Sequence, residues 1–173
     1  MIVVAIIGVL AALAIYGVSR YLRNAKTAEA RSSLGAMAKG NISYYNSEQG
    51  KTSVIPESTD ASVIRVLCDT GSVNHPMPAT VPSGTKYQTK ISDWSDSATG
   101  KGWPCLRFSM EQPQYFQYDY TASGYNTLTG TFTALAMGDL NGDGKTSLFF
   151  FAGAVQSGKV TMAPAVAETN PDE

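Results

Sequence analysis

MIVVAIIGVLAALAIYGV, residues 1–18, contains no charged residue and no proline. A helix needs about 20 apolar residues to cross the hydrocarbon core of a bilayer, so this run predicts a membrane-spanning helix. An alternative interpretation of the run is a cleaved secretory signal, because Ala12-Leu13-Ala14 resembles a cleavage site. However, no basic segment precedes the run and the helical pattern continues past that site. A buried core helix is disfavoured, since little in the remaining sequence would surround so apolar a cylinder.

The helical pattern continues beyond Gly17 in amphipathic form. Apolar residues recur at three- and four-residue spacing, and charged residues fall mostly between them. The first strong helix breaker is Gly50, followed by Pro56. We therefore expect one continuous helix from the start to about residue 47, in an N-terminal unit of residues 1–50. Within that unit, residues 1–18 form a transmembrane segment or filament core and residues 19–50 an amphipathic spine. The apolar positions of the spine are Val18, Tyr21, Leu22, Ala25, Ala28, Leu34, Ala38, Ile42 and Tyr45.

Residues 51–173 are expected to form a single globular head. The stretch 51–104 is rich in Ser, Thr, Pro and Gly, so it reads as loop, with a helical turn or short strand at 62–68. Further on, apolar residues alternate with polar ones, as in half-buried strands. Strands are predicted at 106–110, 116–120, 132–136 and 148–152, with a weaker one at 159–162. Short connections such as 111–114 favour an antiparallel meander, and its apolar face would pack on the amphipathic half of the helix. The predicted fold class is α+β.

Charge and cysteine content narrow the function. Lys and Arg number 13 against 14 Asp and Glu, a net charge of −1, which gives no basis for a nucleic-acid-binding surface. Cys68 and Cys105 form an even pair beyond a membrane segment, which predicts one disulfide in an oxidising compartment. Such a bridge would stabilise the head by about 3–4 kcal/mol. The alternative is two buried free thiols.

No catalytic arrangement is recognisable, so we do not expect an enzyme. The single histidine, His75, lies in a polar loop and is interpreted as a surface residue. No nucleophile motif accompanies it, whereas a catalytic triad needs a base held beside a nucleophile. Asp93 and Asp96 flank Trp94 in a Ser-rich stretch, where paired acids usually form Asx-turns. No Gly-rich phosphate loop follows a strand.

The segment Asp139-Leu140-Asn141-Gly142-Asp143-Gly144-Lys145-Thr146-Ser147 has two interpretations. Oxygen-bearing residues at positions 1, 3 and 5 and Gly at position 6 match the opening of a calcium loop. The possible ligands are Asp139, Asn141, Asp143, the Lys145 backbone and Ser147. Position 12 holds Phe150 where a bidentate Glu is expected. Asn-Gly and Asp-Gly also favour a plain hairpin turn, which we prefer, with no cofactor except this possible calcium.

The opening MIVVAIIGVLAALAIYGVSRY resembles the N-terminal helix of type IV pilins and of the pseudopilins of type II secretion. In that family a basic leader is cut before a methylated Phe, and a Glu follows a few residues later. Leader, Phe and Glu are absent from this chain. Ile15-Tyr16 stands where many members have Ile-Pro. The likeness is strong over residues 1 to about 25. Beyond that it is architectural: a cysteine-bracketed loop, a four-stranded region and the GDLNGDG turn are similar to pilin-like proteins of some Gram-negative bacteria.

The resemblance implies a pilin-like structural subunit that self-associates into a helical filament. Its partners would be other pilins and the pilus assembly machinery. It would reside in the inner membrane before assembly and at the cell surface afterwards. Small residues permit close helix–helix approach in lipid. The expected assembly positions are Ala5, Gly8, Ala11, Ala12, Tyr16 and Gly17.

The sequence leaves two questions open: which way the N-terminal helix is oriented in the membrane, and which of two functions the protein has. By the positive-inside rule, the basic cluster after residue 19 would face the cytoplasm, whereas the cysteine pair puts the head in an oxidising compartment. A basic leader upstream would restore the second orientation. The alternative function is a membrane-tethered extracytoplasmic module that binds a ligand through the calcium-like loop or through the loop bearing Trp94 and Trp103.

Overall fold

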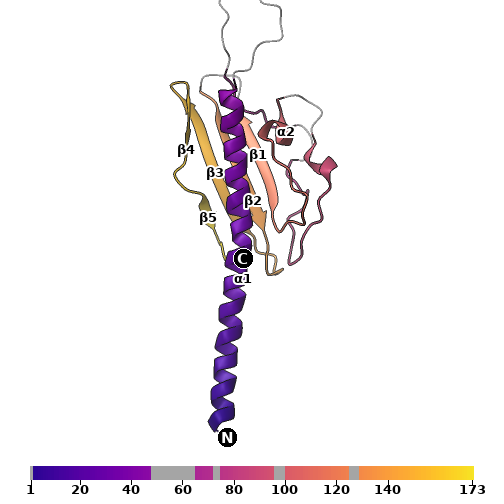
Figure 1. Ribbon diagram of the computed structural model, residues 1–173, viewed down its shortest axis with the longest axis vertical. Coiled ribbons are helices and arrows are strands. Elements are labelled where there is room, and N and C mark those ends of the chain that lie inside the picture. Colours follow the sequence, from indigo (N-terminus) through magenta and orange to yellow (C-terminus); the bar gives the residue numbers. More distant parts are fainter. Residues whose placement is uncertain (1, 48–64, 72–74, 96–99, 125–128) are drawn as a thin grey trace, which may run out of the picture.

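The chain folds into one long helix and one sheet. The computed structural model describes residues 2–47, 65–71, 75–95, 100–124 and 129–173. Helix α1 (Ile2–Asn46) crosses one face of a five-stranded antiparallel sheet with its C-terminal part. Its N-terminal part projects from the head (Figure 1). Residues 2–22 of this part are exposed throughout and are called the stalk below. The predicted α+β architecture is therefore confirmed.

Helix α1 is 45 residues long, so it extends for about 67 Å. The predicted end near residue 47 agrees with the observed end at Asn46. Burial begins only at Thr27, and the buried positions then recur every three or four residues, on one side of the helix. They are Thr27, Ala30, Ser33, Leu34, Met37, Ala38, Asn41 and Tyr45. Tyr21, Leu22, Ala25 and Ala28, which the sequence pattern placed on the apolar side of the spine, are exposed.

The sheet is a meander with one added strand. Strands β1 (Gln117–Ser123), β2 (Thr131–Gly138), β3 (Ser147–Gln156) and β4 (Lys159–Met162) follow one another in space as in sequence. Strand β5 (Ala167–Thr169), which was not predicted, pairs with the N-terminal part of β3. The alternation predicted for 116–120 and 132–136 is confirmed, since the apolar residues of these stretches are at most 2% exposed at every second position: Phe116, Tyr118, Tyr120, Phe132, Ala134 and Ala136.

The predicted strand at 106–110 is wrong. Helix α2 (Gly102–Leu106) occupies its start and ends at Arg107, whose φ of 51° is left-handed. Leu106 and Phe108 are both buried, but they flank a helix terminus instead of alternating along a strand. The predicted 111–114 hairpin is also wrong, because Gln114 pairs with Tyr87.

The stretch predicted as loop contains more order than expected. A 3₁₀ helix, η1 (Ile91–Trp94), lies within it, and α2 begins at its end. The predicted turn or strand at 62–68 is not present over 65–68, which form no regular element, and 62–64 lie outside the described residues.

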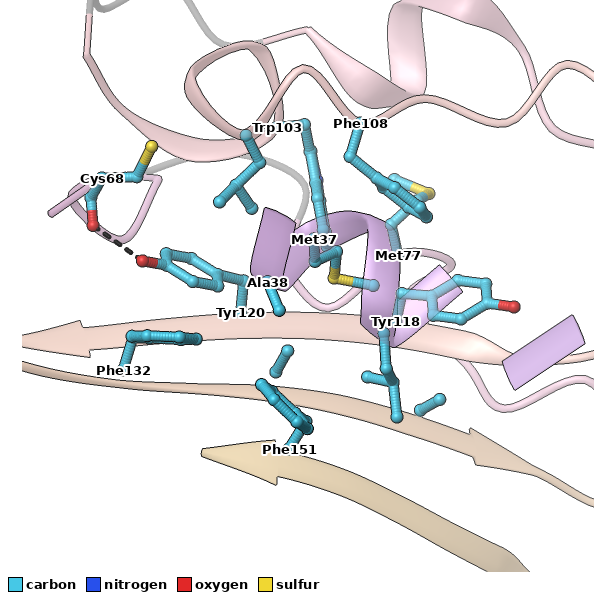
Figure 2. Close-up of a cluster of buried hydrophobic side chains, with 14 of the residues drawn as sticks. Met37, Ala38, Cys68, Met77, Trp103, Phe108, Tyr118, Tyr120, Phe132 and Phe151 are labelled. Carbon is cyan, nitrogen blue, oxygen red and sulfur yellow. Dashed lines mark hydrogen bonds between the residues drawn. The ribbon is translucent and has the colours of Figure 1, made fainter. Parts of the chain in front are cut away.

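A cluster of aromatic side chains packs against Tyr118 of β1, beside α1. Trp94 packs edge-on against Trp103 and Phe108, with ring centroids 5.0 and 5.3 Å apart. Phe108 in turn lies 5.7 Å from Tyr118 of β1. Figure 2 shows Trp103, Phe108 and Tyr118 near Met37 of α1. Trp94 and Trp103 of the polar loop therefore belong to the core of the head and not to its surface.

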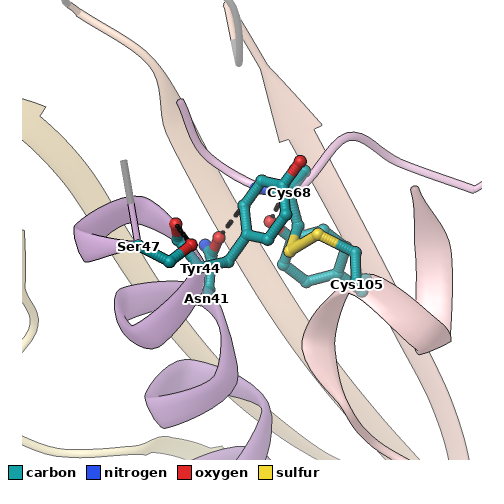
Figure 3. Close-up of a disulfide and its surroundings, with 6 residues drawn as sticks. Asn41, Tyr44, Ser47, Cys68 and Cys105 are labelled. Carbon is teal, nitrogen blue, oxygen red and sulfur yellow. Dashed lines mark hydrogen bonds between the residues drawn. A yellow bond between two sulfur atoms is a disulfide. The ribbon is translucent and has the colours of Figure 1, made fainter. Parts of the chain in front are cut away.

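The predicted disulfide is confirmed. Cys68 and Cys105 are joined, with their Cα atoms 5.8 Å apart. The side-chain oxygen of Asn41 on α1 accepts a hydrogen bond of 2.9 Å from the backbone N–H of Cys68 (Figure 3). The bridge therefore lies directly on the C-terminal part of α1.

Candidate functional site

The projecting half of α1 is the most unusual surface of the molecule. Its large apolar side chains, from Ile2 to Leu22, are between 52% and 78% exposed. Among the described residues α1 is the one helix long and apolar enough to cross a bilayer, judged by length and composition. Its most apolar 18-residue window has a mean hydropathy of 2.6, and none of that window is buried in the head. An exposed apolar surface of this extent is typical of a membrane or protein interaction site.

The six predicted assembly positions all lie on this stalk and all are exposed. Ala5, Gly8, Ala12 and Tyr16 recur at three- or four-residue intervals and share one side of the helix. Ala11 lies at the margin of that side and Gly17 away from it. A Cβ at Gly8 or Gly17 would meet nothing within 4 Å, so both leave the backbone open to a neighbour.

Two polar contacts fasten the stalk to the head at the point where burial begins. The Glu29 carboxylate accepts hydrogen bonds from the backbone N–H of Tyr115, at 3.0 Å, and from the hydroxyl of Tyr118, at 3.1 Å. Burial, together with the Glu29 charge, raises the pKa of Tyr118, so its hydroxyl stays neutral and donates. The Arg31 guanidinium binds both oxygens of Glu168, at 2.6 and 2.9 Å. Sequence patterns carry no signal for these contacts, since each partner is 86 or more residues away.

The 139–147 segment connects β2 to β3, as the hairpin interpretation requires. Asp139 is 3% exposed, and its carboxylate accepts hydrogen bonds from Gly142 N–H, Gly144 N–H and the Ser83 hydroxyl. The bond from Ser83 is the largest cause that lowers the pKa of Asp139, and the backbone N–H groups add to it.

The other candidate calcium ligands also have protein partners. The Asn141 and Asp143 side chains each accept a backbone N–H two residues on, and the Ser147 hydroxyl donates to the Gly138 carbonyl. Lys145 supplies its backbone N–H to Asp143. Within the described ranges, no group of three His, Cys, Asp or Glu side chains is placed to hold a metal ion. Calcium binding here stays a prediction.

The surface interpretation of His75 is wrong. Its side chain is 8% exposed, and its ring stacks on Trp103 with centroids 4.3 Å apart. Asp119 lies 3.7 Å from its Nδ1. Trp103, which covers the imidazole, lies 28 positions further along the sequence. The polar residues next to His75 therefore gave no sign that its side chain is buried.

The indole rings of Trp94 and Trp103 are not exposed as a binding surface. Trp94 is 4% exposed and Trp103 is fully buried. Asp93, at the third position of η1, accepts a 2.9 Å hydrogen bond from the backbone N–H of Lys90 at the N-cap, a capping-box contact instead of the expected Asx-turn. Asp96 lies outside the described residues.

No protein-family model, curated protein sequence or solved structure matches this chain. Support for a function therefore comes from the chain's own geometry. The exposed apolar half of α1, joined without a break to a disulfide-bonded head, is the feature that points to one.

Proposed function

We propose that this protein is a non-enzymatic structural subunit of a type IV pilus or a pilus-like filament. The observation that carries the proposal is the stalk: an apolar helix about 20 residues long that contributes nothing to the core of the head. In a bilayer the stalk is surrounded by lipid. After extraction from the bilayer, the same surface is covered only if stalks of several copies pack together.

The arrangement suits a filament with stalks inside and heads outside. Small side chains at Ala5, Gly8 and Ala12 allow neighbouring helices to approach closely. Side-by-side packing of one surface against a different surface of the next copy gives an open helical array. The partners are thus other copies or related pilins, the machinery that extracts them and the inner membrane of a Gram-negative cell, with the filament on the cell surface.

A second candidate is a tethered ligand-binding module. One observation favours it: an open trough of about 390 Å³ lies over β2, β3 and β4. Uncharged residues line it, and all except Gln156 are small or apolar. They are Thr131, Phe132, Thr133, Ala152, Gly153, Ala154, Gln156, Thr161, Met162 and Ala163. The filament proposal is preferred, because Ala5, Gly8 and Ala12 place small residues on one side of the stalk, which close helix–helix packing requires and a single tether does not.

Self-assembly of the full chain on removal of detergent separates the two candidates. Electron microscopy should show ordered filaments of the parent, whereas a tethered module should give only irregular aggregates. Gly8→Leu should reduce the filaments strongly by forcing stalks apart, while Gly35→Leu serves as a matched control. Gly35 is an α1 glycine beside the head, and a Cβ there also meets nothing within 4 Å. Monomeric parent protein, or equal assembly of Gly8→Leu and parent, would contradict the filament proposal.

A charge in the stalk tests the membrane step separately. Ile7→Asp should oppose residence in the bilayer by about 3 kcal/mol near its centre, so less protein should be recovered in the membrane fraction. Equal recovery of Ile7→Asp and parent would show that the stalk does not reside in lipid.

A further inference from the structure

Three cations and no acidic residue occupy the segment of α1 between the apolar run and the head. They are Arg20, Arg23 and Lys26, here called the basic collar. Seven helical residues, 20–26, extend for about 10 Å. Burial against the head begins immediately after them, at Thr27. The collar is therefore a short cationic patch along one side of the root of the stalk.

Partners within the chain neutralise the collar only weakly. Arg20 lies 3.9 Å from Asp172, and both side chains are more than half exposed, so the pair is worth little. The Lys26 ammonium lies 4.7 Å from the centroid of the Tyr115 ring, and the Lys86 ammonium lies 4.6 Å from the same ring. Two positive charges thus share one aromatic ring at the base of the head.

Two further groups lie beside the collar. The nearby carboxylate of Glu29 already accepts bonds from Tyr115 and Tyr118. The Nε of Arg23 is shielded from solvent and has no hydrogen-bond partner within the described part of the chain. With Lys86, four cations lie at the root of the stalk against the carboxylates of Glu29 and Asp172, so the root carries a net positive charge.

The spacing along α1 matches the layers of a bilayer. Residues 2–19 extend for about 27 Å, close to the roughly 30 Å of the hydrocarbon core. The headgroup region adds roughly 5–8 Å on each side, so residues 20–26 fall at the level of the phosphates. Tyr16 and Tyr21 are 64% and 72% exposed and bracket the start of the collar. Tyrosine is enriched at this depth, because its ring is apolar and its hydroxyl is polar.

We propose that the basic collar docks on the phosphate groups of anionic phospholipids and sets the height of the head above the bilayer. This inference rests on the proposed membrane-inserted state of the subunit. Each guanidinium can bind two oxygens of one lipid phosphate, and the lysine adds a point charge. Long side chains at this level reach toward the headgroups, as snorkelling residues do.

Lipid selectivity of the full chain tests the proposal. The protein is incorporated into phosphatidylcholine vesicles carrying a trace of spin-labelled phosphatidylglycerol or spin-labelled phosphatidylcholine. The fraction of label immobilised by the protein is then read by electron spin resonance. At low salt, phosphatidylglycerol should be immobilised roughly threefold more than phosphatidylcholine, and the preference should fall as salt rises.

Two triple variants identify the residues. Arg20→Gln/Arg23→Gln/Lys26→Gln should abolish the preference. Lys39→Gln/Lys90→Gln/Lys159→Gln removes the same charge from exposed positions of the head and should keep it. Equal immobilisation of the two lipids by the parent would overturn the proposal.

Co-flotation of protein and vesicles, measured on the same samples, separates this proposal from the proposed function. Protein that fails to float contradicts membrane insertion itself. Protein that floats without lipid preference contradicts only the collar proposal. If, in that case, the collar variant also loses self-association, the collar binds acidic residues of a second copy instead of lipid.

Discussion

The Cα of Gly40 on α1 lies directly against the backbone of Leu106 in α2, so closely that a Cβ at Gly40 would overlap the Leu106 carbonyl oxygen. The next residue, Asn41, binds the backbone of Cys68, and Cys105 precedes Leu106. One turn of α1 thus holds both ends of the disulfide-bonded segment. A glycine is required there because two backbones meet without a side chain between them.

Replacing Gly40 should therefore destabilise the head. Gly40→Ala forces α1 away from α2 and should cost about 1–3 kcal/mol of the free energy of unfolding. Gly35→Ala, on the same helix but in open space, should be neutral or stabilise by up to about 1 kcal/mol. Urea unfolding followed by the fluorescence of the buried Trp94 and Trp103 measures both. Equal stability of the two variants would show that the close approach is not maintained.

The disulfide should contribute a large part of the stability of the head. Its partners are 37 residues apart, so the chain-entropy model gives about 4 kcal/mol. Cys68→Ala/Cys105→Ala should lower the urea midpoint accordingly, and the reduced parent should behave similarly. A midpoint that is unchanged in both would contradict this role.

The Arg31–Glu168 pair should give the head a small acid sensitivity. The hydrogen bond from Arg31 is the largest cause that holds the pKa of Glu168 below its ordinary value of 4.5. A carboxyl whose pKa is lowered by folding stabilises the native state above its unfolded pKa, and this contribution is lost as the pH falls through the folded pKa. The side chains are 48% and 26% exposed, so the effect should stay below about 1 kcal/mol.

Glu168→Gln tests that pair. It should lower stability at neutral pH and flatten the stability profile below about pH 4.5, compared with Asp172→Asn as control. Asp172 faces Arg20 at 3.9 Å with both groups largely exposed, so its neutralisation should change little. Identical pH profiles for Glu168→Gln and the parent would show that the Arg31–Glu168 pair does not contribute to the stability of the head.

Asp139 should be the residue on which the β2–β3 connection depends. Asp139→Ala leaves the Ser83, Gly142 and Gly144 donors without their acceptor and should cost about 1–3 kcal/mol. Its lowered pKa has the same sign as that of Glu168, so its contribution is also lost in acid. Asp143→Ala removes an acceptor that is 43% exposed and should cost less.

A chelator tests the calcium interpretation of the same loop. If the loop is a plain hairpin connection, a calcium chelator should leave the melting temperature of the parent unchanged. A drop in melting temperature that Asp143→Ala abolishes would instead establish a calcium site.

Elements set by local periodicity could be predicted from the sequence. The extent of α1 and the inward residues of β1 and β2 follow from spacing, and the cysteine pair from composition and compartment. Helix α2 was missed because Leu106 and Phe108 have strand-like spacing, although a disulfide and a left-handed Arg107 close a short helix there. Long-range partners such as Glu29 with Tyr118 leave no trace in a local pattern.

The place where the helix becomes part of the head could not be predicted either. Amphipathic spacing from Val18 onward suggested packing nine residues before burial actually begins at Thr27. The difference matters for function, because it places the whole basic collar before the first fully buried residue of α1. The residue at which burial of α1 begins depends on where the sheet ends beside the helix, and no local sequence pattern contains that information.

The central claim is that residues 1–21 serve the membrane and assembly and not the folding of the head. The most direct measurement is the sedimentation and urea unfolding of a truncated chain that begins at Leu22. It should be soluble and monomeric, and it should unfold cooperatively with the midpoint of the full chain, since every buried residue of α1 lies at or beyond Thr27. A truncated chain that is unfolded, or that still forms the large assemblies of the full chain, would contradict the claim.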